Sequence, residues 1–311
     1  MNKKVLFIMD PIENIDISKD TTFQLMHSAQ KAGHEIYYLI PNTLSIKSLE
    51  PMGKAVKIYI KLDELPFFND AEVKEHKLSS FDYVLMRKDP PVNNDYIYIT
   101  YILDILKEKN VRVLNSSYAL RNYNEKLLTL FFKDDIPDTI LTKNRDDIAL
   151  FKKKYKKIIL KPLNLMGGRS IYFLDKQDKN LNVIFEDMTN MGKNYILAQE
   201  YIEDVKEGDK RVIVINGKVF REAVIRTSNK KDHRANIAAG GSIEKYYLKD
   251  SEFEVCQKIS NFLKKEDIFF AGIDMIGHKI TEINITSPTC IAEINKFHGI
   301  NLANVFWDEL E

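Results

Sequence analysis

The sequence has little of what several functional classes require. Its 311 residues include only two cysteines, Cys256 and Cys290, which are too few for a disulfide framework and lack the CxxC spacing of a zinc site. No apolar run approaches the roughly 18 residues of a membrane-spanning helix, and the one that ends at Asp10 is too short for a signal peptide. A net charge of +1 creates no field that would attract nucleic acid or an anionic membrane. We therefore expect a cytoplasmic protein with neither kind of partner.

The composition is that of an ordinary globular protein. Hydrophobic residues make up 44% of the chain and charged residues 29%, which excludes a disordered or fibrous protein. A domain usually holds about 100–200 residues, so this length predicts two or three structural units. A chain of this size can bury several cores and hold a cleft between them.

The first third of the chain alternates short apolar runs with helical patterns. Helices are expected at 21–32, between the N-cap Asp20 and Gly33, and at 95–106, with Asp95 as N-cap. The expected strands are 5–9, 36–40, 83–86 and 111–114. This alternation predicts an open parallel α/β sheet with helices on its faces. No GxGxxG follows the first strand, so a dinucleotide-binding site is not expected, and residues 41–82 show no clear pattern.

From about residue 122 the pattern changes. A helix with Leu127, Leu130 and Phe131 on one side opens this part, and Asn216-Gly217 is the strongest hairpin signal in the chain. Further helices are expected at 146–155 and 255–263, and strands at 158–162, 171–174, 211–215, 218–225, 269–276 and 280–284. Helices beside antiparallel hairpins predict an α+β arrangement.

The last predicted hairpin carries a candidate metal site. If its turn spans residues 277–279, Asp274 lies opposite Glu282, and Asn284 shares the face of Glu282 because side chains alternate along a strand. Opposed carboxylates repel, and three oxygen ligands without His or Cys favour Mg²⁺ or Mn²⁺ over Zn²⁺. The alternative is a hairpin with a solvated polar face, and a two-residue turn would place Asp274 on the wrong side.

The loop after the strand at 158–162 is a candidate anion site. Gly167 and Gly168 let backbone amides approach an anion, Ser170 can add a donor, and Lys161 at the strand end can reach a phosphate. The loop is not a P-loop, because the GK[ST] ending is absent. The alternative interpretation is an ordinary turn.

Several arginines lie around a second glycine-rich segment. Another arginine follows a predicted strand in the first third of the chain. Arg211 begins one strand, Arg226 precedes the loop at 227–242, and Arg234 lies within it. This arrangement suits a lid over anionic substrates or, alternatively, a solvated surface loop. Arg87 follows the strand at 83–86, at the edge where ligands of open α/β sheets bind, and can hold a carboxylate.

These features together carry a family resemblance. The acidic hairpin, the Lys-Pro strand end before a glycine loop and the Asp-Lys-Arg strand start recur in this order in ATP-grasp ligases. More closely, the chain resembles the bacterial glutathione synthetases over nearly its whole length, with the Asn-Ile-Thr-Ser-Pro-Thr-Cys run the most specific match. The similar stretches are 9–12, 86–91, 124–127, 159–163, 208–212, 236–241 and 281–290.

The resemblance implies an ATP-grasp fold and a reaction. An N-terminal open parallel α/β domain (1–122) would be followed by a small central lid subdomain (123–200) and a C-terminal antiparallel-sheet catalytic subdomain (201–311). The implied enzyme joins γ-glutamylcysteine to glycine through an acyl phosphate and releases ADP and phosphate. ATP would be the co-substrate, with Mg²⁺ or Mn²⁺, two ions per site, and the family suggests a homotetramer.

The resemblance also assigns roles to individual residues. ATP would be held by Lys126, Lys161, Gly167, Gly168, Ser170, Gln199, Glu200, Tyr201, Ile202 and Asp209. The catalytic residues would be Arg211, Arg226, Arg234, Asn236 and Gly240. The dipeptide would contact Arg87, Ser287, Pro288 and Thr289, and the metal ions Asp274, Glu282 and Asn284. Two positions depart from the family pattern: Asn164-Leu165 stands in place of Asp-Gly, and Glu200 in place of a neutral amide.

Two alternatives stay open. Another ATP-grasp carboxylate–amine ligase, joining D-alanines or adding glutamate to a protein end, would share most of these motifs. A non-catalytic ATP sensor of the same fold is the second alternative, and retention of Asp274, Glu282 and Asn284 argues against it.

Overall fold

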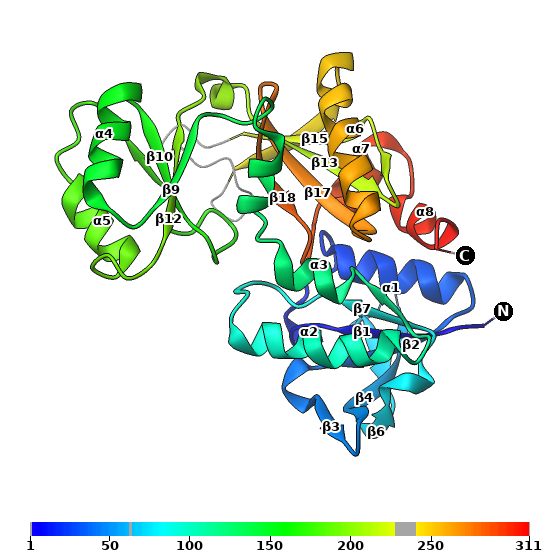
Figure 1. Ribbon diagram of the computed structural model, residues 1–311. Coiled ribbons are helices and arrows are strands. Elements are labelled where there is room, and N and C mark those ends of the chain that lie inside the picture. The colour runs from blue at the N-terminus through cyan, green and yellow to red at the C-terminus, as the bar shows by residue number, and fades with distance from the viewer. Residues whose placement is uncertain (1, 62–63, 228–240, 311) are drawn as a thin grey trace.

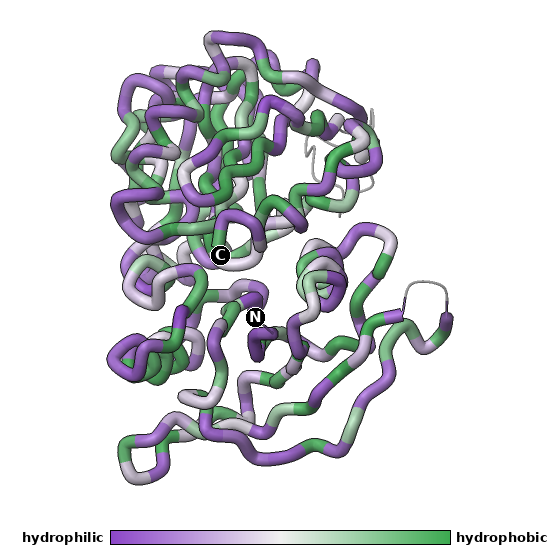
Figure 2. The backbone as a smooth tube through the Cα atoms, turned by 90° about the vertical axis from the view of Figure 1, so that its right-hand side faces the viewer, coloured by the Kyte–Doolittle hydropathy of each residue, from purple (hydrophilic) through white to green (hydrophobic). Residues whose placement is uncertain are grey.

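The computed structural model describes residues 2–61, 64–227 and 241–310, which form three β-sheets (Figure 1). In the side view of Figure 2, the hydrophobic stretches of the backbone lie mostly inside the upper half, with hydrophilic stretches along its outer edge. Among the described residues, no helix is both long and apolar enough to cross a bilayer. Short 3₁₀ helices occur at Ile12–Asn14, Pro41–Thr43, Leu78–Ser80, Leu127–Phe132 and Glu203–Lys206.

The first sheet has the predicted parallel centre. Its order is β3-β4-β2-β1-β7-β8, with β5 and β6 also paired to β4, and the contacts among β2, β1, β7 and β8 are parallel. The strands are β1 (Lys4–Ile8), β2 (Glu35–Leu39), β3 (Ser45–Lys47), β4 (Glu50–Ile60), β5 (Phe68–Asp70), β6 (Lys74–Lys77), β7 (Tyr83–Met86) and β8 (Arg112–Leu114). The segment without a clear sequence pattern supplies the antiparallel strands β3 to β6.

Three helices accompany this sheet: α1 (Thr21–Lys31), α2 (Asn94–Lys107) and α3 (Ser117–Asn122). Asp20 caps α1 as predicted, because its carboxylate accepts a hydrogen bond from the Phe23 amide at 2.7 Å. The predicted cap of α2 is wrong: Asn93 rather than Asp95 precedes the helix, and its side chain accepts from the Tyr96 amide at 3.0 Å. Asp95 therefore lies in the first helical turn, where an acidic side chain favours the helix dipole.

The second sheet is a smaller antiparallel unit with its own core. Its order is β11-β10-β12-β9, formed by β9 (Thr139–Thr142), β10 (Ile158–Pro162), β11 (Tyr172–Leu174) and β12 (Ile196–Glu200). The helices α4 (Arg145–Tyr155) and α5 (Leu181–Thr189) supply Ile148 and Phe185 to that core (Figure 1). The helix expected before this unit is a 3₁₀ helix that buries Leu128 and Thr129, whereas Leu130 and Phe131 are exposed.

The third sheet holds the predicted hairpins. Its order is β16-β15-β13-β17-β18, with β14 on β13. The strands are β13 (Asp209–Ile215), β14 (Lys218–Val219), β15 (Glu222–Thr227), β16 (Ser242–Tyr247), β17 (Phe270–Ile276) and β18 (Lys279–Asn284), and the helices are α6 (Asp250–Lys265), α7 (Ile291–His298) and α8 (Leu302–Asp308). Asn216 and Gly217 form the predicted turn, both with positive φ. The strand expected at 218–225 is interrupted between β14 and β15.

The first and third sheets share one core. Helix α8 packs against α1, and the Trp307 indole donates to the Leu25 carbonyl at 2.9 Å. Beyond the end of β8, the buried Asn115 amide donates to the carbonyls of Phe270 and Ile285 at 2.7 and 2.6 Å, and its oxygen accepts from the Phe270 amide at 2.8 Å. One side chain thus joins the N-terminal sheet to both β17 and the chain after β18.

We expect Asn115→Ala to lower the free energy of unfolding by roughly 3 kcal/mol, because it leaves buried backbone groups of Phe270 and Ile285 without partners. Urea denaturation measures the change. The control is Asn122→Ala, whose exposed amide donates only to the Tyr118 carbonyl and should cost less than about 0.5 kcal/mol. Equal losses in the two variants would contradict the joining role of Asn115.

Candidate active site

The β17–β18 hairpin places Asp274 directly opposite Glu282, as predicted, but the turn that joins the two strands differs from the predicted one. The predicted three-residue turn is wrong: Ile276 pairs with Lys279, so only Gly277 and His278 form the turn. A bulge then adds Thr281 to β18, and this extra residue restores the predicted register. Gly277 is required in the turn because its φ is +56° and an added Cβ would lie 2.4 Å from an Asp204 carboxylate oxygen.

Cationic side chains neutralise both opposed carboxylates. Arg211 Nε and Nη2 donate to the two Asp274 oxygens at 2.6 and 3.1 Å, and Arg226 Nη2 lies 3.0 Å from Asp274 Oδ1. Lys126 Nζ lies 2.9 Å from Glu282 Oε1. Burial alone would raise the pKa of Asp274, but Arg211 and Arg226 outweigh it and hold that pKa well below its usual value. The repulsion expected between these carboxylates is therefore already relieved within the protein.

Strand β13 turns alternate residues toward this charge cluster. Asp209 accepts from Arg226 Nη2 at 2.5 Å, while its other oxygen has no partner among the described residues. Burial raises the pKa of Asp209 to about 6, against the opposing effect of Arg226. Lys210, between Asp209 and Arg211, faces the other way and forms a buried ion pair with Glu252 at 2.5 Å.

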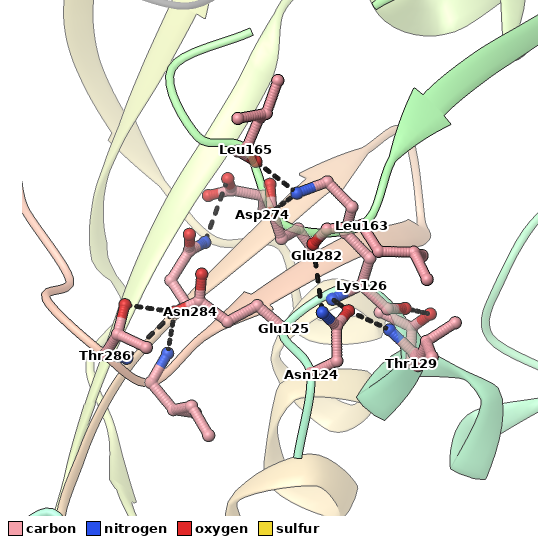
Figure 3. A network of polar contacts seen from close by, with 12 residues as sticks. Asn124, Glu125, Lys126, Thr129, Leu163, Leu165, Asp274, Glu282, Asn284 and Thr286 are labelled. Carbon is pink, nitrogen blue, oxygen red and sulfur yellow. Dashed lines mark hydrogen bonds and ion pairs between the residues drawn. The ribbon is translucent and has the colours of Figure 1, made fainter. Parts of the chain in front are cut away.

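A short segment before the 3₁₀ helix connects the glycine-rich loop to this hairpin (Figure 3). Asn124 donates to the Leu163 carbonyl at 3.0 Å, and Lys126 donates to the Leu165 carbonyl at 2.8 Å as well as to Glu282. Lys126 is only 4% exposed. The loop is therefore attached to β18 through one lysine side chain.

Glu125 is a residue of this site that the sequence reasoning missed. Its carboxylate accepts from the amides of Ile285 and Thr286 at 2.7 and 2.9 Å and from the Thr286 hydroxyl at 2.8 Å (Figure 3). Burial, and then the nearby Glu282, raise the pKa of Glu125. Glu125 thereby fixes the chain immediately after Asn284. The sequence signal that could have identified Glu125 is its position next to Lys126, a predicted ATP-binding residue.

A first cleft lies between the second sheet and the β17–β18 hairpin, with an empty volume of about 890 Å³. The Lys161 ammonium in this cleft forms no hydrogen bond or ion pair with any described residue, and burial lowers its pKa. The predicted ATP-binding residues that line the cleft are Lys126, Lys161, Gly167, Gly168, Gln199, Glu200, Tyr201, Ile202 and Asp209. Ser170 does not line it and is exposed.

A second cleft, with an empty volume of about 1730 Å³, lies between the first and third sheets. Arg87, Ser287 and Thr289 line it together with Arg211, Arg226 and Asn284. Pro288 is not among its lining residues, and its carbonyl accepts from Arg87 Nη2 at 3.0 Å. The structure thus places the predicted dipeptide-binding residues on one cleft, except for the Pro288 side chain.

The two clefts adjoin at four residues that line both: Met166, Gly167, Asp274 and Glu282. A molecule in one cleft and a molecule in the other would therefore approach each other beside the opposed carboxylates. Arg234, Asn236 and Gly240, predicted as catalytic, lie outside the described residues.

The donors for a cation are two carboxylates and one amide. Asn284 Nδ2 donates to Asp274 Oδ2 at 3.2 Å, and Glu282 uses one oxygen for Lys126 (Figure 3). The part of the chain that is described holds no group of three or more His, Cys, Asp or Glu side chains suited to a metal. An all-oxygen set of this kind fits a hard divalent cation that also binds phosphate oxygens.

The three sheets have the arrangement of the ATP-grasp fold. The solved D-cycloserine synthetase DcsG matches with a TM-score of 0.67 at 10% identity, covering 98% of each chain. The D-alanine–D-alanine ligase of Bacillus anthracis matches with a TM-score of 0.59 at 14% identity, covering 99% of this chain and 96% of that one. At such identities the similarity shows the fold alone.

Sequence comparison narrows the class to one family. The model of the prokaryotic glutathione synthetase N-terminal domain matches residues 3–121, and that of the prokaryotic glutathione synthetase ATP-grasp domain matches residues 125–299. The glutathione synthetase of Wigglesworthia glossinidia brevipalpis is 39% identical over 308 residues, covering 99% of this chain and 97% of that protein. That of Buchnera aphidicola subsp. Baizongia pistaciae is 41% identical over 305 residues, covering 98% and 94%. The chain belongs to the prokaryotic glutathione synthetase family, and it is an ATP-dependent ligase that uses a divalent metal.

Proposed function

We propose that this ligase joins γ-glutamylcysteine to glycine and cleaves ATP to ADP and phosphate. The observation that supports it best is that the two clefts adjoin at Asp274 and Glu282. A nucleotide in the first cleft and a dipeptide in the second would then bring a γ-phosphoryl group beside a carboxylate. The full-length match to the named glutathione synthetases supports the choice of substrates.

The proposed reaction has two steps. An oxygen of the cysteinyl carboxylate attacks the γ-phosphorus, the bond to ADP breaks, and an acyl phosphate forms. The neutral amine of glycine then attacks the acyl carbon, phosphate leaves, and the amine loses a proton. Activation is needed because a carboxylate is a poor electrophile, and the protein contributes mainly positioning and neutralised charge.

Each cleft supplies different groups to these steps. Lys126 and Lys161, which line the first cleft, would hold phosphates, and the segment from Gln199 to Ile202 would hold the base. Arg211 lines only the second cleft yet contacts Asp274 at the junction, so we assign it to the acyl-phosphate side. Met166 and Gly167 line the junction and can exclude water from a hydrolysable intermediate.

Asp274, Glu282 and Asn284 would hold the metal. When bound there, a divalent cation would neutralise phosphate charge. We propose Mg²⁺ or Mn²⁺, two ions per site. A cytoplasmic location and a homotetramer are the corresponding proposals for the protein as a whole.

Release of ADP by the purified protein tests this function. With Mg²⁺, γ-glutamylcysteine and glycine all present we expect continuous ADP release, and omission of either substrate should stop turnover. D-Alanine and glutamate, offered in place of glycine, serve as controls for the amine. Faster turnover with one of these amines, or with D-alanine as the acid, would replace the proposed reaction with another ligation.

A further inference from the structure

Among the described residues, no strand pairs with the outer edge of β18, which ends the order of the third sheet. One row of its backbone amides therefore faces away from β17 and needs other acceptors. Two of these amides, at Ile283 in β18 and at Ile285 just after it, donate to one residue. Ile283 donates to the Glu125 carbonyl at 3.0 Å, and Ile285 donates to the Glu125 carboxylate at 2.7 Å. Glu125 thus takes the place of a strand here, with its backbone on one side of Asn284 and its side chain on the other.

The side chain of Asn284 is oriented by the neighbouring strand. Its Nδ2 donates to the Gly272 carbonyl at 3.3 Å and to Asp274 Oδ2 at 3.2 Å (Figure 3). Both partners are acceptors, so the amide nitrogen faces β17 and the amide oxygen faces away from these two groups. That oxygen accepts no hydrogen bond from any described residue, and Asn284 lines the second cleft. Asn284 is therefore oriented to offer its oxygen as a ligand, provided that its backbone is held in place.

Two consecutive residues hold the two ligands that β18 would supply. Lys126 donates to Glu282 Oε1 at 2.9 Å. Besides the Ile285 amide, Glu125 Oε1 accepts the amide and the hydroxyl of Thr286 at 2.9 and 2.8 Å, so this one oxygen carries three hydrogen bonds. The other carboxylate oxygen of Glu125 accepts none from a described residue. Lys126 thus fixes its ligand through the side chain, whereas Glu125 acts on the backbone around Asn284.

We propose that Glu125 is a positioning residue for the divalent cation: by accepting the amides on both sides of Asn284, it holds Asn284 where it completes the donor set with Asp274 and Glu282. This inference rests on the proposed function, which assigns those three residues to the metal, and adds a residue that does not itself contact the ion. Groups that hold a metal ligand in place change the metal affinity by about 10- to 100-fold when they are replaced. Glu125 would therefore set the affinity for the cation through its reach to the two amides, and not through its charge.

Two substitutions separate the reach of Glu125 from its charge. Glu125→Gln keeps the length and an oxygen acceptor without the charge, whereas Glu125→Asp keeps the charge on a side chain one carbon shorter. Mn²⁺ is titrated into the protein saturated with a non-hydrolysable ATP analogue, and the electron paramagnetic resonance signal of free Mn²⁺ gives the affinity. We expect Glu125→Asp to weaken Mn²⁺ binding by about 10-fold or more and Glu125→Gln to keep it within about threefold of the wild type. The control is Glu266→Asp, which shortens a glutamate that accepts from the Tyr123 hydroxyl at 2.8 Å and lines neither cleft.

A double substitution tests whether Glu125 acts through Asn284. Asn284→Ala should itself weaken Mn²⁺ binding by about 10-fold or more, because it removes an oxygen ligand. Glu125→Asp in that background should cost less than about twofold more, because the residue that it holds in place is gone. Circular dichroism confirms that each variant is folded. If Glu125→Asp does not fold, Thr286→Val replaces it, since it removes only the hydroxyl donor to Glu125 and should weaken Mn²⁺ binding by about threefold.

The outcomes decide between positioning, direct ligation and no role. A loss of Mn²⁺ affinity in Glu125→Gln as large as in Glu125→Asp would show that the charged carboxylate itself contacts the cation, and would overturn the proposal. Unchanged Mn²⁺ affinity in folded Glu125→Asp, or losses that simply add to those of Asn284→Ala, would also overturn it. Failure of the proposed function would look different, because the wild-type protein would then release no ADP with γ-glutamylcysteine and glycine, or Asn284→Ala would bind Mn²⁺ as tightly as the wild type.

Discussion

Replacement of Glu282 by alanine is expected to lower ligase turnover by on the order of 10³-fold or more while the protein stays folded. Glu282 lines both clefts at their junction, so its loss removes a cation ligand where charge develops. The substitution also leaves the buried Lys126 with only the Leu165 carbonyl as a partner. Steady-state ADP release measures turnover, and circular dichroism confirms the fold.

Glu282→Gln separates the cation from the ion pair with Lys126. Glutamine can still accept a hydrogen bond from Lys126 but is a poor ligand for a divalent ion, so turnover should fall nearly as far as in the alanine variant. Glu203→Gln is the control, since Glu203 forms exposed ion pairs with Lys157 and Lys206. Turnover of Glu282→Gln within tenfold of the wild type would show that no required cation binds there.

Arg211→Lys is expected to lower turnover by about 10³-fold at saturating substrates and to change ATP affinity by less than tenfold. Lysine keeps the charge but loses the planar fork that contacts both Asp274 oxygens. Arg211 lines the second cleft and not the first, so nucleotide affinity should depend on it little. Steady-state kinetics and calorimetric titration with ATP give the two numbers.

The matched control for Arg211→Lys is Arg112→Lys. Arg112 forms an exposed ion pair with Asp267 outside both clefts, so both turnover and ATP affinity should stay at wild-type values. If Arg211→Lys instead weakened ATP binding and left saturated turnover unchanged, Arg211 would belong to the nucleotide site.

Local sequence patterns were sufficient to predict the strands that bury a continuous apolar run. The strands β1, β2 and β7 follow apolar runs that lie inside the first sheet, and their predicted positions agree with the structure. Strand β4 was missed although Val56, Ile58 and Ile60 are buried and alternate with exposed Lys57 and Tyr59. Its partners β3, β5 and β6 are too short to show a pattern of their own.

The features of the site that the sequence could not show depend on pairing between segments that are distant in the chain. Turn length alone would have put Asp274 out of register, and the bulge at Thr281 exists only against its partner strand. Asp274 has two arginine partners because β13 and β15 bring Arg211 and Arg226 to β17.

The single core shared by the first and third sheets bears on how ligands enter. Asn115 and helices α1 and α8 hold the two walls of the second cleft together, so widening that cleft would separate buried side chains. The second sheet has a separate core and forms one wall of the first cleft. The core of this sheet would therefore stay intact if the sheet moved away from the β17–β18 hairpin. We therefore expect the first cleft to widen more readily than the second.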